Sequence, residues 1–164
     1  MIMTDAVART IALADLAATG RLAAALAARA RAGDVIALSG GLGAGKTAFA
    51  RAFIHARRGG DAVSEVPSPT FTLVQVYDLP DAAVWHFDLY RIKHPEEAFE
   101  LGLEEALAEA IALIEWPEQL GRLLPPRRLD VALSPGDTPE SRRAVLTPYG
   151  DWAPRIADIG TADG

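Results

Sequence analysis

Residues 40–47 read Gly40-Gly41-Leu42-Gly43-Ala44-Gly45-Lys46-Thr47 and match the pattern G-x-x-x-x-G-K-[ST] at every fixed position. An apolar run at 35–38 precedes them, and residues 47–55 follow with apolar side chains at helical spacing, so a strand leads in and a helix leads out. In this setting the glycines let successive backbone N–H groups turn toward phosphate oxygens at a helix N-terminus. Lys46 would then reach the β- and γ-phosphates of a nucleotide, and the hydroxyl of Thr47 would bind Mg²⁺.

The alternative interpretation is a glycine-rich turn that happens to precede a helix. The chain holds only two lysines, Lys46 and Lys93. Its other residues with a permanent positive charge are all arginine. One of these two lysines stands where the motif needs it, which composition alone does not explain. We therefore interpret residues 40–47 as a phosphate-binding loop, or P-loop.

Length and composition limit the architecture. With 164 residues, half of them apolar, the chain is long enough to bury one core. We expect one P-loop domain over residues 1–149 and a poorly ordered tail over residues 150–164, where no periodic pattern is evident. No apolar run is long enough to span a membrane, and the N-terminus lacks the basic and apolar regions of a signal peptide, so we expect a cytoplasmic location.

Three further features of composition exclude classes of function. The absence of cysteine excludes disulfides and thiolate metal sites. A net charge of −6 argues against a chain that wraps nucleic acid by itself. The absence of asparagine removes the Asn-Lys-x-Asp type of guanine-binding motif, which disfavours a GTPase.

The sequence predicts strands and helices in alternation. Apolar and β-rich runs predict strands at 7–13, 35–39, 71–77, 83–90, 111–115, 129–133 and 143–147. Helical spacing predicts helices at 15–31, 47–55, 95–101 and 103–110. A turn-forming cluster at 78–81 joins the third and fourth strands, so these two are expected to form an antiparallel hairpin, and the last two strands to form another.

Two of these strands end in a carboxylate, Asp88 after residues 84–87 and Glu115 after residues 111–114. A carboxylate at the end of a buried strand is costly unless it meets a metal ion, a cation or a proton. Either residue could therefore bind Mg²⁺ or orient an attacking water, or could simply cap a nearby helix. His86, on the same strand as Asp88, is interpreted as a packed strand residue.

Residues 67–70, Pro-Ser-Pro-Thr, carry two hydroxyls on a backbone held extended by two prolines. A strand lead-in is one interpretation of this segment. A switch that senses the γ-phosphate is the other, because P-loop proteins place such segments after the P-loop helix. Ser68 and Thr70 are the candidate contacts.

Four blocks stand in fixed order along the chain: Gly41–Thr47, Ser68–Leu73, His86–Arg91 and Glu115-Trp116-Pro117. Together they resemble the TsaE family (also called YjeE), the P-loop ATPase subunit of the bacterial machinery that makes threonylcarbamoyladenosine at position 37 of tRNA. The resemblance covers roughly residues 7–147. Many families share the first block, whereas the other three in this order are specific to this one.

The resemblance implies a single α/β P-loop NTPase domain whose mixed, partly antiparallel central sheet is flanked by helices. It implies binding of ATP and Mg²⁺, with weak hydrolysis by the isolated subunit. The implied partners are proteins of the TsaD and TsaB types, with tRNA reached only indirectly through their complex. We expect no membrane association, and a monomer when the chain is isolated.

The resemblance also assigns roles to residues by motif. Asp88 and Lys46 would be catalytic, and Thr47 and Glu115 would hold Mg²⁺. The nucleotide would contact Gly41, Leu42, Gly43, Ala44, Gly45, Lys46, Thr47, Ala48, Ser68, Thr70, Trp116 and Arg142. One departure from the family is Ala48, where many members have Ser or Thr, which puts one phosphate contact in doubt.

The expected function is a Mg²⁺-dependent ATPase that acts as a nucleotide-dependent gate on the TsaD–TsaB transferase. No arginine is identifiable from sequence as a finger acting in cis, so slow turnover accelerated by partners is expected. A small-molecule kinase and an adaptor that binds ATP without hydrolysis are the alternatives, because Walker motifs serve all three classes.

Overall fold

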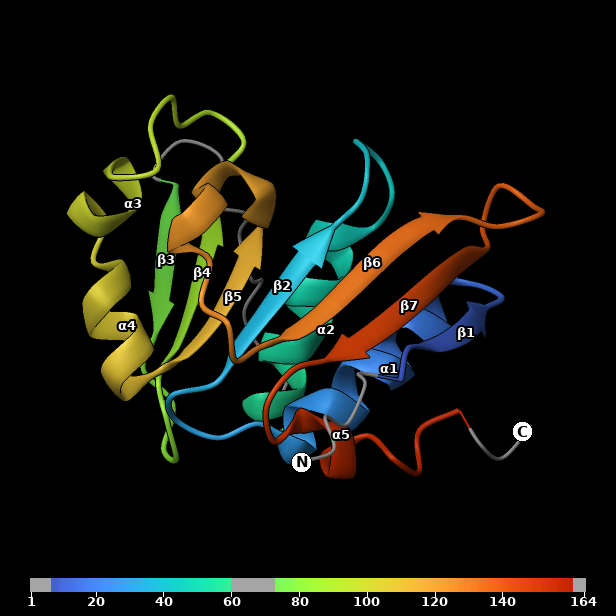
Figure 1. The fold of residues 1–164 in the computed structure, drawn as a ribbon. Helices are drawn as coiled ribbons and strands as arrows, with labels where there is room; N and C mark the ends of the chain where they lie inside the picture. The colour runs from blue at the N-terminus through green and yellow to red at the C-terminus, as the bar shows by residue number, and fades with distance from the viewer. Residues whose placement is uncertain (1–6, 60–72, 161–164) are drawn as a thin grey trace, which may run out of the picture.

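The computed structural model describes residues 7–59 and 73–160. In these ranges seven strands form one sheet in the order β1-β7-β6-β2-β5-β4-β3 (Figure 1). The strands are β1 Arg9–Leu13, β2 Val35–Ser39, β3 Val74–Tyr77, β4 Val84–Asp88, β5 Ile111–Glu115, β6 Leu129–Pro135 and β7 Arg142–Pro148. The predicted fold class, an α/β domain with a mixed sheet, is confirmed.

The centre of the sheet is parallel and its margins are antiparallel. β2 pairs in parallel with β5 and β6, and β5 pairs in parallel with β4. β3 pairs with β4, β7 with β6 and β1 with β7, all antiparallel. The central strands β2 and β5 are apolar on both faces, as buried parallel strands require. Both predicted hairpins, β3–β4 and β6–β7, are present.

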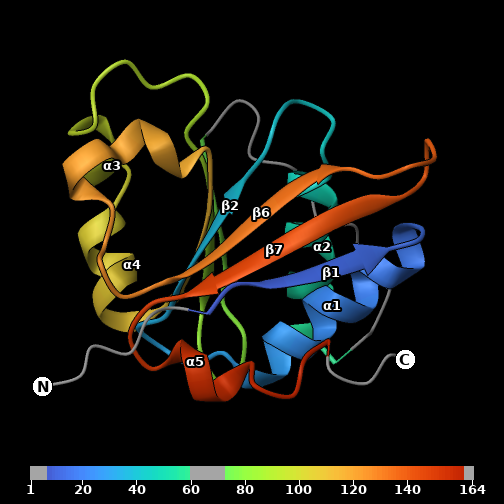
Figure 2. The same cartoon turned by 45° about the vertical axis from the view of Figure 1, so that its right-hand side comes forward.

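Helices cover both faces of the sheet (Figures 1 and 2). α1 (Leu16–Arg29) and α2 (Lys46–Arg57) pack on one face against Ile36, Leu38 and other core side chains. The short helices α3 (Glu97–Glu100) and α4 (Leu103–Glu109), with the 3₁₀ helix η1 (Pro117–Leu123), belong to the core of the other face. None of the helices in the described ranges is both long and apolar enough to cross a bilayer.

The expectation of a poorly ordered tail from residue 150 is wrong for its described part. Helix α5 (Trp152–Arg155) and the turn after it join the same core as α1, with Trp152, Ile156 and Ile159 all buried. Arg155 donates to both carboxylate oxygens of Asp34, at 2.6 and 3.0 Å. Figure 2 shows this segment lying beside the C-terminal end of α1, where Arg155 donates to the carbonyl oxygen of Arg29. The domain therefore extends at least to residue 160.

The spacing of these apolar residues explains why the tail packs. Positions 152, 156 and 159 follow one another at the interval that places side chains on one helical face. This pattern is too short to stand out from an unstructured segment, and only contact with α1 and β1 makes burial possible. Its burial is a consequence of tertiary packing.

Candidate functional site

The P-loop joins the end of β2 to the start of α2, as its sequence predicts. Gly43 and Gly45 adopt positive φ, 78° and 107°, which a side chain would disfavour. Gly40 also has positive φ, and a Cβ there would collide with the carbonyl oxygen of Leu133 on β6. The glycines therefore serve two physical needs: the curvature of the loop and its close approach to the sheet.

Lys46 is folded back over its own loop. Its Nζ donates to the carbonyl oxygens of Gly40 and Gly41, at 2.7 and 2.8 Å, and lies 4.1 Å from the centre of the Trp116 ring. Burial lowers the pKa of the Lys46 ammonium from its ordinary value, and nearby carboxylates, Glu115 foremost, oppose that shift. The ammonium thus stands at the loop, held by groups that a phosphate could replace.

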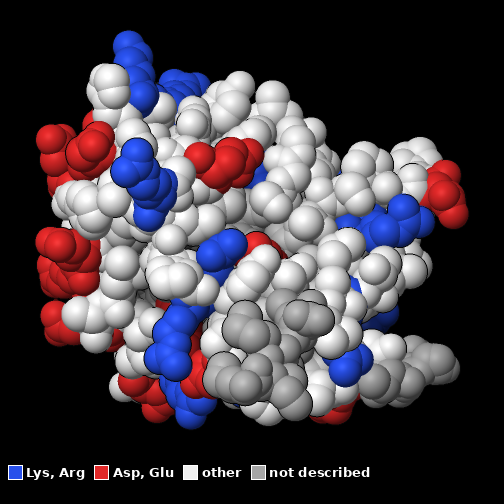
Figure 3. All heavy atoms as spheres, viewed as in Figure 1, with Lys and Arg blue, Asp and Glu red and all other residues white. Residues whose placement is uncertain are grey.

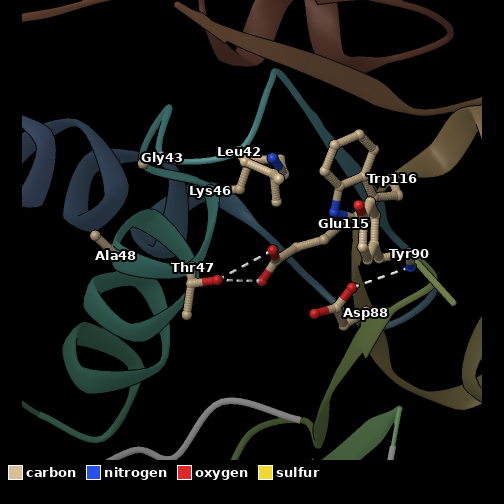
Figure 4. Close-up of a pocket in the computed structure, with 10 residues that line it drawn as sticks. Leu42, Gly43, Lys46, Thr47, Ala48, Asp88, Tyr90, Glu115 and Trp116 are labelled. Carbon is tan, nitrogen blue, oxygen red and sulfur yellow. Dashed lines mark hydrogen bonds between the residues drawn. The ribbon is translucent and has the colours of Figure 1, made fainter. Parts of the chain in front are cut away.

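Thr47 and Glu115 meet across the space between α2 and β5 (Figure 4). The Thr47 hydroxyl lies 3.1 Å from each carboxylate oxygen of Glu115, to which it donates. Glu115 is 2 % exposed, so its charge is held by a few polar neighbours and not by solvent.

This pair fits a Mg²⁺ site. A hydroxyl and a carboxylate are hard oxygen ligands, and Mg²⁺ in nucleotide sites takes one or two carboxylates together with waters and phosphate oxygens. Within the described ranges, no cluster of three or more His, Cys, Asp or Glu side chains could hold a metal ion by itself. The donor set therefore suits a cation that is bound together with a phosphate ligand.

Asp88 ends β4 and lies opposite Glu115 in the parallel register of β4 and β5. Its Oδ1 accepts a hydrogen bond of 3.1 Å from the backbone N–H of Tyr90. Burial raises the pKa of the Asp88 carboxyl above its ordinary value, and the charge of Glu115 acts in the same direction, while the Tyr90 N–H opposes it. The structure thus brings the two predicted strand-end carboxylates side by side.

These groups line one cavity of about 280 Å³. The residues around it are Leu42, Gly43, Gly45, Lys46, Thr47, Ala48, Asp88, Tyr90, Glu115 and Trp116. Leu42, at the tip of the loop, is 75 % exposed. Ala48 lines the cavity from the first turn of α2 without offering a hydroxyl. Eight of these lining residues were predicted as nucleotide or metal contacts, and Asp88 as catalytic.

Two aromatic side chains form one wall of the cavity. The rings of Tyr90 and Trp116 lie 4.8 Å apart between centroids. Trp116 has a left-handed backbone, with φ 61° and ψ 52°, directly after β5. Trp116 was predicted to lie near the nucleotide, whereas Tyr90 was missed, although it stands two residues after Asp88 in the quoted His86–Arg91 block.

Arg142, at the start of β7, reaches the P-loop from the neighbouring hairpin. Its Nη2 donates to the carbonyl oxygen of Gly43 at 3.2 Å, and its Nη1 donates to the carbonyl oxygens of Pro139 and Ser141. Arg142 is not among the described residues that line the cavity. It contacts the loop itself, so a contact with the nucleotide stays a prediction.

His86 is buried as predicted, but it also belongs to the site. Its Nε2 lies 2.7 Å from Oε2 of Glu115, and no part of the side chain is exposed. Sequence reasoning missed this pair because nothing in the sequence states the register of β4 against β5. Ser68 and Thr70, the candidate switch contacts, lie outside the described residues.

The sequence is similar to known proteins of one family. Residues 13–145 match the family model of TsaE, described as threonylcarbamoyl adenosine biosynthesis protein TsaE. A tRNA threonylcarbamoyladenosine biosynthesis protein TsaE from Rickettsia conorii is 41% identical over 129 residues, covering 79% of this chain and 73% of that protein. The protein of the same description from Bacillus subtilis is 35% identical over 135 residues, with 81% of each chain covered.

The fold is also similar to a solved structure. The crystal structure of YdiB from Bacillus subtilis superposes with a TM-score of 0.78 at 25% identity, covering 99% of this chain and 100% of that one. The likeness in fold therefore extends over nearly the whole of both chains.

Proposed function

The chain belongs to the TsaE family, and from this membership we propose that it is the ATP-binding and ATP-hydrolysing component of the machinery that forms threonylcarbamoyladenosine in tRNA. The observation that carries the proposal is the meeting of Thr47 and Glu115 at 3.1 Å, with Asp88 beside them, in a cavity walled by a P-loop. Each group has the chemistry that phosphoryl transfer to water requires.

Binding of ATP is supported by the loop and by Lys46. Backbone N–H groups of the loop and of the first turn of α2 are suited to bind phosphate oxygens. We expect the Lys46 ammonium to exchange the carbonyls of Gly40 and Gly41 for phosphate oxygens, which are better acceptors because they are charged. Its ring contact with Trp116 would keep the side chain near the loop during this exchange.

Thr47 and Glu115 would hold Mg²⁺, whose charge, when bound, offsets that of the phosphate oxygens. Asp88 would orient a water molecule toward the γ-phosphorus and accept its proton as the new P–O bond forms and the bond to the leaving ADP oxygen breaks. The raised pKa of Asp88 favours this role, because a carboxylate becomes a better base as its pKa approaches the working pH.

Slow turnover by the isolated chain is expected from the cations around the cavity. Lys46 is the one Lys or Arg among the described lining residues. P-loop ATPases and GTPases gain much of their rate from an additional arginine, which a partner supplies in many cases. We therefore propose that proteins of the TsaD and TsaB types stimulate hydrolysis, and that the nucleotide state in turn changes affinity for these partners.

The surface charge supports indirect access to tRNA. Exposed glutamates gather on the side of the molecule formed by α3 and α4 (Figure 3): Glu96, Glu100, Glu104, Glu105 and Glu109. With a net charge of −6, the chain offers little attraction to a phosphate backbone. The partners would therefore carry the tRNA.

The test is release of inorganic phosphate from ATP, measured for this chain alone and with added TsaD–TsaB, each with Mg²⁺ and with EDTA. We expect a slow rate that needs Mg²⁺ and rises with partners. Binding of the partners is measured in parallel with ATP, with ADP and without nucleotide, and the three affinities should differ.

Several outcomes would contradict parts of the proposal. ATP binding without any phosphate release, even beside partners, would favour an adaptor that does not hydrolyse ATP. Phosphate transferred to a metabolite would favour a kinase. Equal partner affinity in all three nucleotide states would exclude the gate while leaving the ATPase intact.

A further inference from the structure

His86 occupies a position that the proposed chemistry does not yet use. It stands two residues before Asp88 on β4, so both side chains emerge on the same face of the strand. Glu115 lies opposite Asp88 on the neighbouring strand. His86 therefore lies beneath the carboxylate pair, on the core side of the cavity, and is itself fully buried.

The surroundings of the imidazole determine where its proton lies. Nε2 faces Oε2 of Glu115 at 2.7 Å, while the buried Nδ1 has no hydrogen-bond partner among the described residues. A proton on Nδ1 would be a buried donor without an acceptor, and Nε2 would direct a lone pair at a carboxylate. A proton on Nε2 removes both costs, so His86 donates to Glu115.

Among the described residues, two donors from different elements hold Glu115. His86 on β4 donates to Oε2, and Thr47 on α2 lies within 3.1 Å of both oxygens. The strand, through His86, determines the orientation of the carboxylate before any ligand binds. Thr47 contacts both oxygens, and Oε1 is the one that has no contact with His86.

We propose that His86 is a positioning residue that holds the Glu115 carboxylate toward Thr47, in the orientation that a divalent cation requires. This inference rests on the proposed Mg²⁺-dependent function. Hydrogen bonds to a ligating carboxylate orient it and tune its basicity, and loss of such a partner commonly weakens metal affinity or activity about 10- to 100-fold.

The rival explanation is that His86 only satisfies a buried carboxylate and so stabilises the fold. The two explanations differ in what they expect from a residue that keeps the donor. His86→Gln can place an amide N–H near the position of Nε2, whereas His86→Leu keeps the bulk and removes the donor. His94→Gln, at an exposed histidine, is the matched control.

The experiment measures the Mg²⁺ concentration for half-maximal ATP binding, together with the ATP affinity in EDTA. We expect His86→Leu to raise the Mg²⁺ requirement about 10- to 100-fold while changing the metal-free affinity less than about threefold, and His86→Gln to recover most of the loss. Equal losses in the Leu and Gln variants, or an unchanged Mg²⁺ requirement in folded His86→Leu, would overturn the positioning role.

A second measurement stands even where His86→Leu does not fold. Long-range ¹H–¹⁵N spectra of the metal-free wild type, with His86 assigned through the Gln variant, should show the tautomer protonated on Nε2. An Nδ1–H tautomer would overturn the inference. If ATP binding and hydrolysis by the wild type do not depend on Mg²⁺, both the proposed function and this inference are overturned. If the wild type depends on Mg²⁺ and His86→Leu has the same Mg²⁺ requirement, this inference alone is overturned.

Discussion

Replacing Asp88 by Asn separates the proposed catalytic role of this residue from its structural one. The substitution keeps the size of the side chain and the oxygen that accepts from the Tyr90 N–H at 3.1 Å. It removes the negative charge and the ability to take a proton from water. The variant therefore alters the proposed chemistry while the hydrogen bonding at the end of β4 persists.

The expected loss of rate follows from the role of Asp88. A positioned general base contributes about 10²- to 10⁴-fold to a rate, which corresponds to roughly 3–5 kcal/mol of barrier. Affinity for ATP should change less than about threefold, because Lys46, Thr47 and Glu115 are untouched. The proposed loss lies in the chemical step and not in binding.

The same substitution should affect stability with a defined sign. Burial and Glu115 raise the pKa of Asp88 in the folded state, so the native protein holds this proton more tightly than the unfolded chain does. That contribution to stability is present below the ordinary pKa of 3.8 and is lost as the pH rises through the raised value. At neutral pH the ionised carboxylate is therefore unfavourable, and Asp88→Asn should melt at a higher temperature than the wild type.

Phosphate release, ATP binding and thermal melting at several pH values check these three expectations on one pair of proteins. The gap in melting temperature between Asp88→Asn and the wild type should close as the pH falls below 3.8. A variant that hydrolyses ATP at the wild-type rate would refute the catalytic reasoning and transfer the role to Glu115. A variant less stable than the wild type at neutral pH would refute the electrostatic reasoning.

Three further predictions test the rest of the site and the domain. Lys46→Ala should weaken ATP binding about 10- to 100-fold, which corresponds to the loss of a hydrogen bond to a charged group, and should leave the circular dichroism spectrum unchanged. An unaltered ATP affinity, measured by fluorescence anisotropy, would contradict this prediction. Gly40 has φ 139°, and a Cβ there would collide with the Leu133 carbonyl oxygen, so Gly40→Ala should lower the free energy of unfolding by about 1–3 kcal/mol. Gly41→Ala should lower it far less, because the space around a Cβ at Gly41 is open. Similar denaturation midpoints for the two variants would contradict the steric argument. Trp152→Ala should lower the free energy of unfolding by about 3–5 kcal/mol and the melting temperature by on the order of 10 °C, because Trp152 is buried. Leu16→Ala, at an exposed side chain, should change the melting temperature little. An unchanged melting temperature in Trp152→Ala would mean that the packing of α5 does not stabilise the domain.

Most of the fold could be predicted from local patterns. The apolar runs of β2 and β5 indicated strands, and the turn-forming segments indicated both hairpins. Residues 40–47 required a strand before them and a helix after them, so the position of the P-loop followed directly. Short elements were less certain: η1 was not predicted, and α3 covers only four of the seven residues expected.

The candidate site was predictable where function demands particular residue types at one place in the sequence. Lys46 and Thr47 lie in a single motif, and Asp88 and Glu115 each end a strand. Tyr90 lay within a quoted block and was missed, because its role as a wall of the cavity depends on the ring of Trp116, which it meets across 4.8 Å.

By itself the sequence determined the phosphate-binding loop, the alternation of strands and helices, and the pair of strand-end carboxylates, because each depends on residues that are neighbours along the chain. The tertiary structure alone decided that His86 meets Glu115, that Arg142 contacts the loop at Gly43, and that Trp152 enters the core. These contacts depend on which strands are neighbours and in what register, and on a helix face that is stable only when it is covered. Long-range packing supplies that information, and no short stretch of sequence contains it.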